Sequence, residues 1–248
     1  MNILVAISRV PDTTTKILVG ADGKSIDNNN VKFILNPYDE FALEEALRIK
    51  EKNGGNVTAI TVGNDLNAET LRNALAMGVD NAVLIKDDGE FDSYFVAKNI
   101  AEYAAKSNPD IIFLGKQSID FDSLQIPSYL GEFLNLPVVT IATKIDIEGT
   151  KVTAEREIEG GKEVVETSLP CVFSAQKGLN NPRYPKLPDI MKAKKKPIEE
   201  IAASSFDNLV EITKMEIPSR SRLNKIFGDT DEDIQNVVRL LHEEAKVI

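Results

Sequence analysis

Apolar and polar positions alternate along residues 1–135 in two patterns, which predict short strands and longer helices in turn. Compact apolar runs predict buried strands at 2–7, 57–62, 82–86 and 110–114. Apolar residues at helical spacing predict helices at 38–52, 67–77, 93–106 and 123–134. Strands separated by helices of this length indicate βαβ units, so we expect an α/β fold with a mostly parallel, doubly wound sheet.

The pattern changes after Pro137. Residues 138–175 hold β-rich runs joined by Gly-containing turns at 148–150 and 159–161. Runs joined in this way predict an antiparallel hairpin extension on an edge of the sheet.

Residues 202–248 lack the α/β pattern and are predicted to form a C-terminal arm. Residues 206–227 are interrupted by proline and predicted to be extended, whereas residues 229–248 predict a short amphipathic helix. The apolar face of that helix consists of Ile234, Val237, Val238, Leu241 and Ala245. Such an arm cannot bury its apolar face alone, so we predict an α/β domain over residues 1–201 and an arm that needs a partner.

Composition excludes several classes of protein. A net charge of −10 argues against nucleic-acid binding, and no apolar run reaches the ~18–20 residues of a membrane span. The N-terminus has no basic region before its apolar run, which argues against a signal peptide. The single cysteine, Cys171, fits a reducing compartment, and the single histidine, His242, argues against a histidine-rich metal site. We therefore expect an intracellular protein without membrane insertion.

The loops after the predicted strands carry the candidate chemistry, because ligands of parallel α/β sheets bind at the carboxyl ends of the strands. Residues 115–126 combine a glycine, Lys116 and two aspartates ahead of a predicted helix, an arrangement that suits a phosphate group. The residues alone leave open a simpler interpretation, in which Gly115 ends a strand and the aspartates cap a helix. Asn36 or Asp39 is expected to cap the helix at 38–52. Neither a P-loop nor a GxGxxG motif is present.

The stretch "NNPRYPKLPDIMKAKKKPIEEI", residues 180–201, is basic, rich in proline and contains apolar side chains that no strand or helix pattern explains. A run of lysines on an acidic protein is often only a solvated surface, and Leu187 would ordinarily be assigned to the core. The lysine run has no aromatic companions, so a nucleic-acid interpretation is poor.

Five segments together resemble the β (small) subunit of electron-transfer flavoproteins, of the AMP-binding, non-bifurcating type. They are "LNPYDEFALEEALRIKEK", "TLRNALAMGVDNAVLI", "DIIFLGKQSIDFD", "EREIEGGKEVVETSLPCV" and "LNNPRYPKLPDIMKAKKKPIE". The resemblance is in register over residues 1–200. It implies the adenine-nucleotide alpha-hydrolase-like variant of the fold.

The resemblance also implies a function. The subunit would form a heterodimer with an alpha subunit that holds most of the FAD, and would itself bind a structural AMP without a redox role. Electrons would come from acyl-CoA and related dehydrogenases of fatty acid beta-oxidation and pass to electron-transfer flavoprotein-quinone oxidoreductase. No catalytic acid, base or nucleophile is implied, since the subunit positions cofactors. The expected location is the cytoplasm, or the mitochondrial matrix of a eukaryote.

Carried over residue by residue, the resemblance implies a cofactor site at the ends of three strands. Its members are Ala6, Asn36, Pro37, Tyr38, Asp39, Val62, Gly115, Lys116, Gln117, Ser118, Ile119, Asp120, Phe121, Asp122, Ser123, Leu124, Gln125 and Ile126. Tyr38 is implied as the aromatic contact of the flavin. One departure concerns the phosphate: the family reads Gln-Thr-Gly or Gln-Val-Gly where this chain has Gln125-Ile126-Pro127, which removes one or two donors. AMP binding is therefore expected to be weaker than is usual in the family.

The resemblance further implies that residues 180–200 form a recognition loop for partner dehydrogenases, with Leu187 as its anchor. Pro185 and Pro188 restrict the backbone on both sides of that leucine. The implied partner-binding residues are Leu187, Pro188, Ile190, Met191, Lys192, Lys195 and Glu157. Glu157 matches the position that pairs with the flavin domain; otherwise it is an exposed carboxylate on a strand.

Three alternatives remain open at this stage. One is an electron-bifurcating relative with a second FAD in place of AMP. Another is a free-standing nucleotide-binding stress-type protein, which would lack the recognition loop and the arm. The third is a hydrolytic or transfer enzyme that uses Lys116, Asp120 and Asp122.

Overall fold

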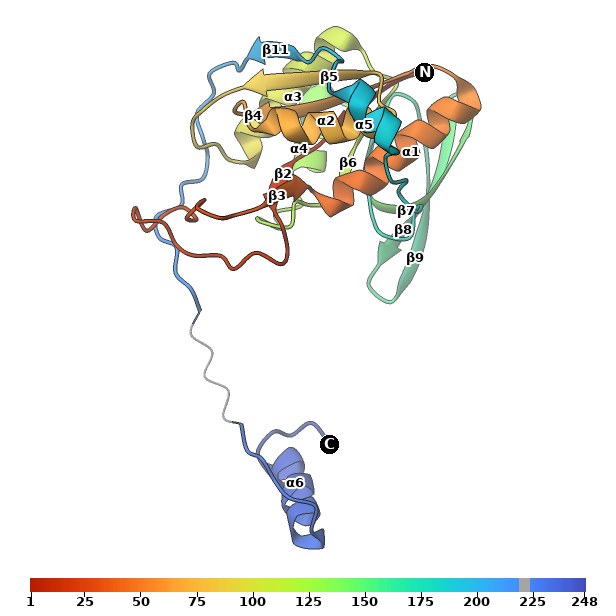
Figure 1. Ribbon diagram of the computed structural model, residues 1–248. Coiled ribbons are helices and arrows are strands. Elements are labelled where there is room, and N and C mark those ends of the chain that lie inside the picture. Colours follow the sequence, from red (N-terminus) through yellow and green to blue (C-terminus); the bar gives the residue numbers. More distant parts are fainter. Residues whose placement is uncertain (219–223) are drawn as a thin grey trace.

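The computed structural model describes residues 1–218 and 224–248, and within them nine strands form one sheet in the order β11-β5-β4-β1-β6-β10-β7-β8-β9 (Figure 1). The strands from β11 to β7 pair in parallel. They are β1 (Asn2–Ala6), β4 (Asn56–Gly63), β5 (Asn81–Lys86), β6 (Ile111–Gly115), β7 (Val138–Glu148), β10 (Cys171–Ala175) and β11 (Glu199–Ala202). The predicted mostly parallel sheet is confirmed.

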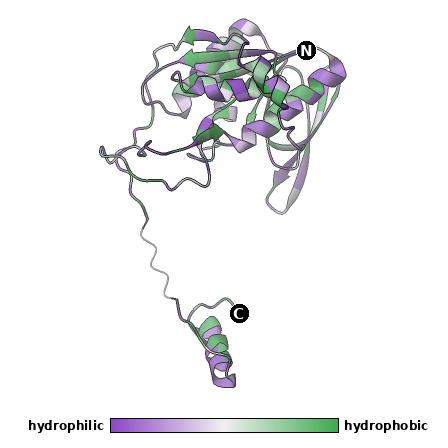
Figure 2. Cartoon of the chain, viewed as in Figure 1, coloured by the Kyte–Doolittle hydropathy of each residue, from purple (hydrophilic) through white to green (hydrophobic). Residues whose placement is uncertain are grey.

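Helices cover both faces of this sheet, as a doubly wound fold requires. On one face α1 (Pro37–Asn53) and α2 (Asn67–Met77) pack against alternate strand residues such as Ile3 and Val5. On the other face α3 (Ser93–Ser107) and α4 (Ile126–Leu134) pack against Leu4, Ile60 and Ile112. Each central strand is therefore buried on both sides, which explains its continuous apolar run. The central strands are mostly hydrophobic, whereas the edge hairpin is largely hydrophilic and the helices are mixed (Figure 2).

The predicted antiparallel extension is confirmed for residues 138–168, where β8 (Lys151–Ile158) runs antiparallel to both β7 and β9 (Gly161–Ser168) at the edge of the sheet. It is wrong for residues 171–175, which form β10 and pair in parallel with β6 and β7. The two turns of the extension contain Gly149 and Gly160 at φ of 62° and 81°, a backbone region that favours glycine. A separate short ribbon pairs β2 (Arg9–Pro11) with β3 (Phe33–Leu35).

Three local predictions are wrong. The fourth helix begins at Ile126 rather than near residue 123, so Asp120 and Asp122 precede it and do not cap it. Asn36 stands at the N-cap position of α1, but neither its side chain nor that of Asp39 caps the helix, because both bond to distant segments. The recognition loop does contain regular structure, the short helix α5 (Leu187–Ala193).

The chain beyond residue 201 continues to pack on the α/β unit before the arm departs. The proposed boundary at residue 201 falls inside β11, which pairs with β5. Beyond it the amide of Ala203 donates to the Lys86 carbonyl at 3.1 Å, and the amide of Ser204 donates to Asn99 at 2.8 Å. Residues 219–223, part of the segment predicted to be extended, lie outside the described residues.

The predicted C-terminal helix is present as α6 (Asp231–Glu243), drawn apart from the sheet (Figure 1). Thr230 caps it, since its hydroxyl accepts a hydrogen bond from the Asp233 amide at 3.2 Å. None of its residues is buried, so its apolar face has no partner among the described residues. Among residues 1–218 and 224–248, no helix is both long enough and apolar enough to cross a bilayer.

Candidate functional site

A cleft of about 810 Å³ opens where β1, β4 and β6 end, at the carboxyl edge of the sheet. The predicted cofactor residues that line it are Ala6, Asp39, Val62, Gly115, Lys116, Gln117, Ser118, Asp120, Phe121, Ser123, Leu124, Gln125 and Ile126. The predicted residues outside its lining are Asn36, Pro37, Tyr38, Ile119 and Asp122. Because separate segments converge here, the cleft has the size and position expected for a nucleotide in an α/β fold.

Asp39 connects the start of α1 to the ends of two strands. Its carboxylate accepts hydrogen bonds from the Ser8 amide at 2.7 Å and the Gly115 amide at 2.9 Å. Burial raises the pKa of Asp39 to about 7, although these amide donors and Asn36 oppose the shift. Asp39 was expected to cap α1, but its carboxylate instead binds the amides of Ser8 and Gly115.

Gly115 allows β6 to end in contact with α1. A Cβ atom on Gly115 would lie 2.4 Å from Asp39 Oδ1 and 2.7 Å from Tyr38 Cβ, too close for any side chain. The glycine is therefore required by packing.

Asn36 and Tyr38 support the loop after β6. The Asn36 side-chain amide donates to the Gln117 carbonyl at 2.9 Å, and Lys116 Nζ lies 4.8 Å from the centre of the Tyr38 ring. The Oδ1 atom of Asn36 is buried and has no hydrogen-bond partner within the described residues. Because Asn36 lies outside the cleft lining, its side chain acts on the site through the loop that it holds.

Residues 117–125 form a bent loop ahead of α4. Asp122 and Leu124 take positive φ values of 51° and 53°, and the Asp122 carboxylate accepts a hydrogen bond from the Gln117 side chain. Ser123 lies 3.1 Å from Ser93, hydroxyl to hydroxyl, which ties the loop to the start of α3. Pro127 lines the cleft within the first turn of α4, where a missing N–H is tolerated but cannot serve a phosphate.

Residues 208–212, which sequence reasoning placed in the arm, close one side of the cleft; we name them the strap. The Asp92 carboxylate accepts hydrogen bonds from the amides of Leu209 at 2.7 Å and Val210 at 2.9 Å. The Asn208 side chain accepts from the Asp92 amide at 3.0 Å and donates to the Glu90 carbonyl at 2.9 Å. Asp92 also caps α3 by accepting from Phe95, a role readable from its place before a helix.

Further cleft residues were missed by the sequence analysis: Arg9, Thr61, Asn67, Phe91, Asp92 and Ser93. Arg9 lies over the Phe33 ring at 3.7 Å, and burial lowers its pKa from the ordinary arginine value. Neither Arg9 nor Lys116 takes part in an ion pair across residues 1–218 and 224–248. These two cations share the lining with the acidic residues Asp39, Glu90, Asp92, Asp120 and Glu211, so an anionic group would be favoured only close to Arg9 or Lys116.

The predicted docking residues lie away from this cleft. Leu187 begins α5 with 74% of its surface exposed, and Pro188, Ile190, Met191 and Lys195 are exposed as well. Lys192 lies 3.8 Å from Asp189 in a surface ion pair. Glu157 lies separately, on β8, where its carboxylate accepts from Gln176 at 3.3 Å.

Comparisons with known proteins cover the residues of both the cleft and the recognition loop. A family model described as an electron transfer flavoprotein domain matches residues 24–206. The chain is 42% identical, over all of both chains, to the electron transfer flavoprotein subunit beta of Bacillus subtilis (strain 168). It is 40% identical to the protein of the same name from Dictyostelium discoideum, with 100% of this chain and 99% of that protein covered. It is 38% identical to the mitochondrial counterpart from Oryza sativa subsp. japonica, with both chains covered completely.

Proposed function

The chain belongs to the electron transfer flavoprotein family, and from that membership we propose that it is the β subunit of a heterodimeric electron carrier. In this proposal an alpha subunit holds most of the FAD, and this chain binds AMP, supports the flavin domain and docks the electron donor. The proposed donors are acyl-CoA and related dehydrogenases, and the proposed acceptor is a quinone oxidoreductase. The location follows the source: the cytoplasm, or the mitochondrial matrix in a eukaryote.

The observation that carries the AMP assignment is the convergence of separate segments on one cleft of about 810 Å³. Adenosine would lie between Ala6 and Val62, which line the cleft at the ends of β1 and β4. The phosphate would lie near the start of α4, where the helix N-terminus favours an anion and Lys116 adds a cation. AMP would supply no chemistry of its own; its role is structural.

The phosphate contact is weaker than is usual in the family. Ile126 has no hydroxyl and Pro127 has no amide hydrogen, so one or two donors are lost. A hydrogen bond to a charged group contributes roughly 1.5–3 kcal/mol. We therefore propose that this chain retains AMP but releases it more readily than relatives with the Gln-Thr-Gly sequence.

The flavin would meet this subunit at two places. Tyr38, beneath Lys116 at the start of α1, is the proposed aromatic contact of the flavin. Glu157 on β8 is the proposed ion-pair partner of the flavin domain. FAD supplies the redox chemistry when bound, and these side chains only orient the domain that carries it.

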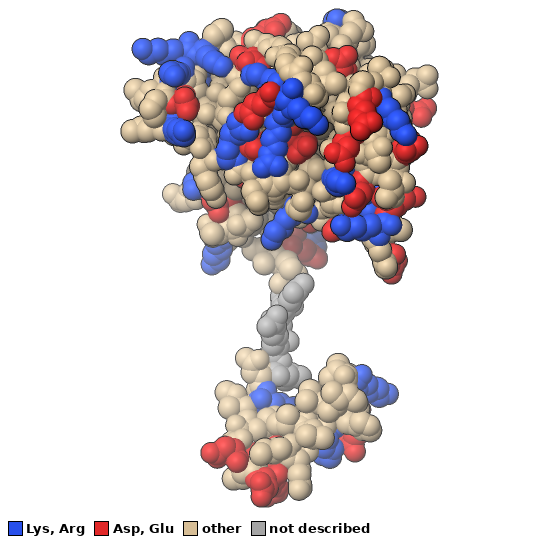
Figure 3. Space-filling view, turned by 90° about the vertical axis from the view of Figure 1, so that its right-hand side faces the viewer, with Lys and Arg blue, Asp and Glu red and all other residues tan. Residues whose placement is uncertain are grey.

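Docking is proposed for the recognition loop. Leu187 is exposed between two prolines, and filling a partner's pocket with this side chain would contribute about 1.5–3 kcal/mol. Lys192 and Lys195 follow on the same segment. On the face turned to the right of Figure 1, basic side chains are interspersed with acidic ones (Figure 3). The lysines of the loop itself, rather than this mixed surface, would guide an acidic partner surface to Leu187.

The nucleotide content of the purified heterodimer tests the proposal. The chain is coexpressed with its alpha subunit, the complex is denatured, and the released nucleotides are identified by mass spectrometry. We expect AMP and FAD in equal amounts. Two FAD and no AMP would overturn the AMP assignment in favour of an electron-bifurcating carrier.

A further inference from the structure

The recognition loop exposes apolar side chains on a segment too short to order itself. Tyr184 is 93% exposed and Met191 54% exposed, on either side of Leu187. The helix α5 has only 7 residues, and an isolated helix shorter than ~12–15 residues is marginal in water. Its orientation must therefore come from contacts with the rest of the molecule.

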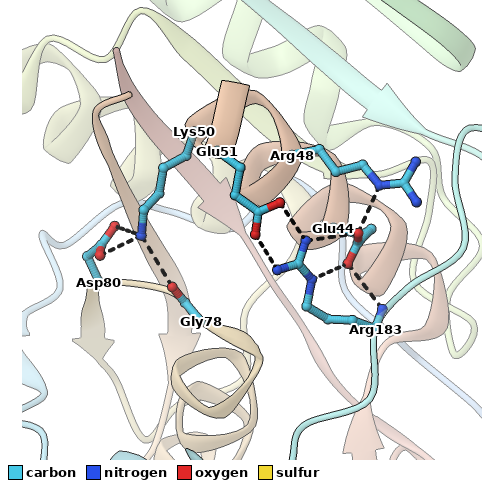
Figure 4. A network of polar contacts seen from close by, with 7 residues as sticks. All are labelled: Glu44, Arg48, Lys50, Glu51, Gly78, Asp80 and Arg183. Atoms are coloured by element: carbon cyan, nitrogen blue, oxygen red, sulfur yellow. Dashed lines mark hydrogen bonds and ion pairs between the residues drawn. The ribbon is translucent and has the colours of Figure 1, made fainter. Parts of the chain in front are cut away.

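Arg183 fixes the beginning of the loop to α1 (Figure 4). Its Nε donates to Glu44 at 2.8 Å, its Nη2 donates to the other Glu44 oxygen at 3.1 Å, and its Nη1 donates to Glu51 at 2.5 Å. Its Nη2 also donates to Glu51 at 3.2 Å, and the backbone amide of Arg183 donates to Glu44 at 3.1 Å.

The Glu44 side chain is only 4% exposed, so this contact differs from an ordinary surface ion pair. Burial alone would raise the pKa of Glu44, but hydrogen bonds from Arg183 and Arg48 outweigh it and hold the pKa below the usual range. A forked guanidinium bound to a buried carboxylate fixes both position and direction.

Arg72 on α2 fixes the other end of the loop. Its Nη1 donates to the Ala193 carbonyl at 2.7 Å and also bonds to the Lys196 carbonyl. The Lys196 ammonium in turn donates to the Val79 carbonyl at 2.8 Å, and Ala193 is 2% exposed within the core. Both ends of the loop are thus anchored, and the apolar side chains project between them.

We infer that Arg183 and Arg72 are positioning residues for docking, which hold Leu187 and its neighbours in their binding geometry before a partner arrives. This inference rests on the proposed docking function of the loop. Association is weakened when a partner must first order a flexible segment, and an anchored loop avoids that cost. Neither arginine needs to touch the partner.

The test uses the intact heterodimer with FAD bound, and a purified acyl-CoA dehydrogenase supplied with excess acyl-CoA. Flavin reduction is followed against dehydrogenase concentration. Arg183→Ala should raise KM about tenfold and leave kcat within about twofold, because only the ordering of the loop is changed. Arg183→Lys, which keeps the charge but loses the fork, should lie between.

Arg48→Ala is the matched control. Arg48 also bonds to Glu44, at 2.8 Å from Nε, but within the described residues it forms no hydrogen bond or ion pair with the loop. It should leave KM unchanged. Amide hydrogen exchange gives a second readout: residues 184–192 should exchange faster in Arg183→Ala and not in Arg48→Ala.

Arg72→Ala is a second test, needed in case Arg183→Ala fails to fold. Arg72 donates to backbone carbonyl groups, so its removal leaves no buried carboxylate without a partner. Arg72→Ala should also raise KM. The double variant Arg183→Ala with Leu187→Ala should have a KM close to that of Leu187→Ala alone. The position of the loop matters only while the Leu187 side chain is present to dock.

The outcomes separate the two claims. If Leu187→Ala raises KM while Arg183→Ala and Arg72→Ala do not, the loop docks without help from the two arginines, and the inference is wrong. Additive effects in the double variant would also overturn it. If Leu187→Ala leaves KM unchanged, the docking function itself fails.

Discussion

At the scale of single residues, Asp39 organises the cleft through a carboxylate that is both buried and bonded. Its two oxygens accept hydrogen bonds from the amides of Ser8, which follows β1, and Gly115, which ends β6. The same burial that makes these bonds strong also disfavours the ionised form and raises the pKa to about 7. The protein therefore keeps a titratable group where two strand ends and a helix meet.

This group makes stability depend on pH in a defined window. The unfolded carboxyl has a pKa near 3.8 and the folded one about 7, so between these values the folded state binds the extra proton. Stability should then fall as pH rises from about 4 to 7, with a slope of at most about 1.4 kcal/mol per pH unit. Asp39→Asn should flatten this slope, measured as the free energy of unfolding in urea from pH 4 to 8.

The exposed Asp88 offers the control, and Asp88→Asn should leave the slope unchanged. A slope in the Asp39→Asn variant equal to that of the wild type would show that other groups cause the pH dependence.

Through the family resemblance the sequence predicted many of the residues that line the cleft, but it missed others and did not reveal every reason for their identity. Strand and helix periodicity, with the rule that loops meet at the carboxyl edge, was enough to bring Asp39 and Lys116 together. The need for glycine at residue 115 depends on the approach of α1, a tertiary contact across 76 positions between Gly115 and Asp39. The unpaired Oδ1 of Asn36 likewise depends on packing that no local pattern encodes.

At the scale of elements, the strap couples the start of the arm to the nucleotide site. Asn208 makes two hydrogen bonds to the segment before α3, and each contributes about 0.5–1.5 kcal/mol. On the proposed function, Asn208→Ala should therefore loosen the strap and speed AMP release about five- to tenfold. The measurement is the loss of AMP from the heterodimer during dilution, followed by mass spectrometry.

The neighbouring Asp207 is exposed and provides the matched substitution, Asp207→Ala, which should release AMP at the wild-type rate. Equal release rates for both variants would mean that the strap does not retain the nucleotide.

Docking and flavin positioning should separate by element, because Leu187 lies on α5 and Glu157 on β8. On the proposed function, Leu187→Ala should raise KM for the dehydrogenase about tenfold or more, from ~1.5–3 kcal/mol of lost burial. Glu157→Ala should instead lower the rate of flavin reduction and leave KM unchanged. Thermal unfolding should barely change for Leu187→Ala; a large loss of stability with unchanged kinetics would assign this leucine to the core.

Periodicity predicted the long elements well and the short ones badly. The helix α5 has 7 residues and buries only Ala193, so it shows no apolar stripe. The edge strand β11 has 4 residues, with the sequence EEIA, and its pairing with β5 comes from a backbone register that side chains do not reveal. Elements held by backbone pairing or by remote anchors leave little trace in a hydrophobic pattern.

At the scale of the whole molecule, the arm beyond the strap is the part that the α/β unit does not explain. The helix α6 exposes Ile234, Val238 and Leu241 on one face, and none of its own residues is buried. A helix of 13 residues with an uncovered apolar face gains most of its stability from packing against a partner. For a chain of this family, we propose the alpha subunit as that partner.

Removing residues 214–248 tests this role without disturbing the cleft, because the strap at 208–212 and its bonds to Asp92 remain. The truncated chain should keep the fold and melting temperature of the α/β unit, yet fail to retain the alpha subunit on a sizing column. The full-length double variant Ile234→Asp with Val238→Asp should weaken the heterodimer in the same direction, since a charge in a buried apolar contact is costly. Asn236→Asp, on the opposite face of α6, should leave assembly intact. If both altered chains still form a heterodimer of wild-type affinity, the arm serves another partner and the subunits meet through the α/β unit alone.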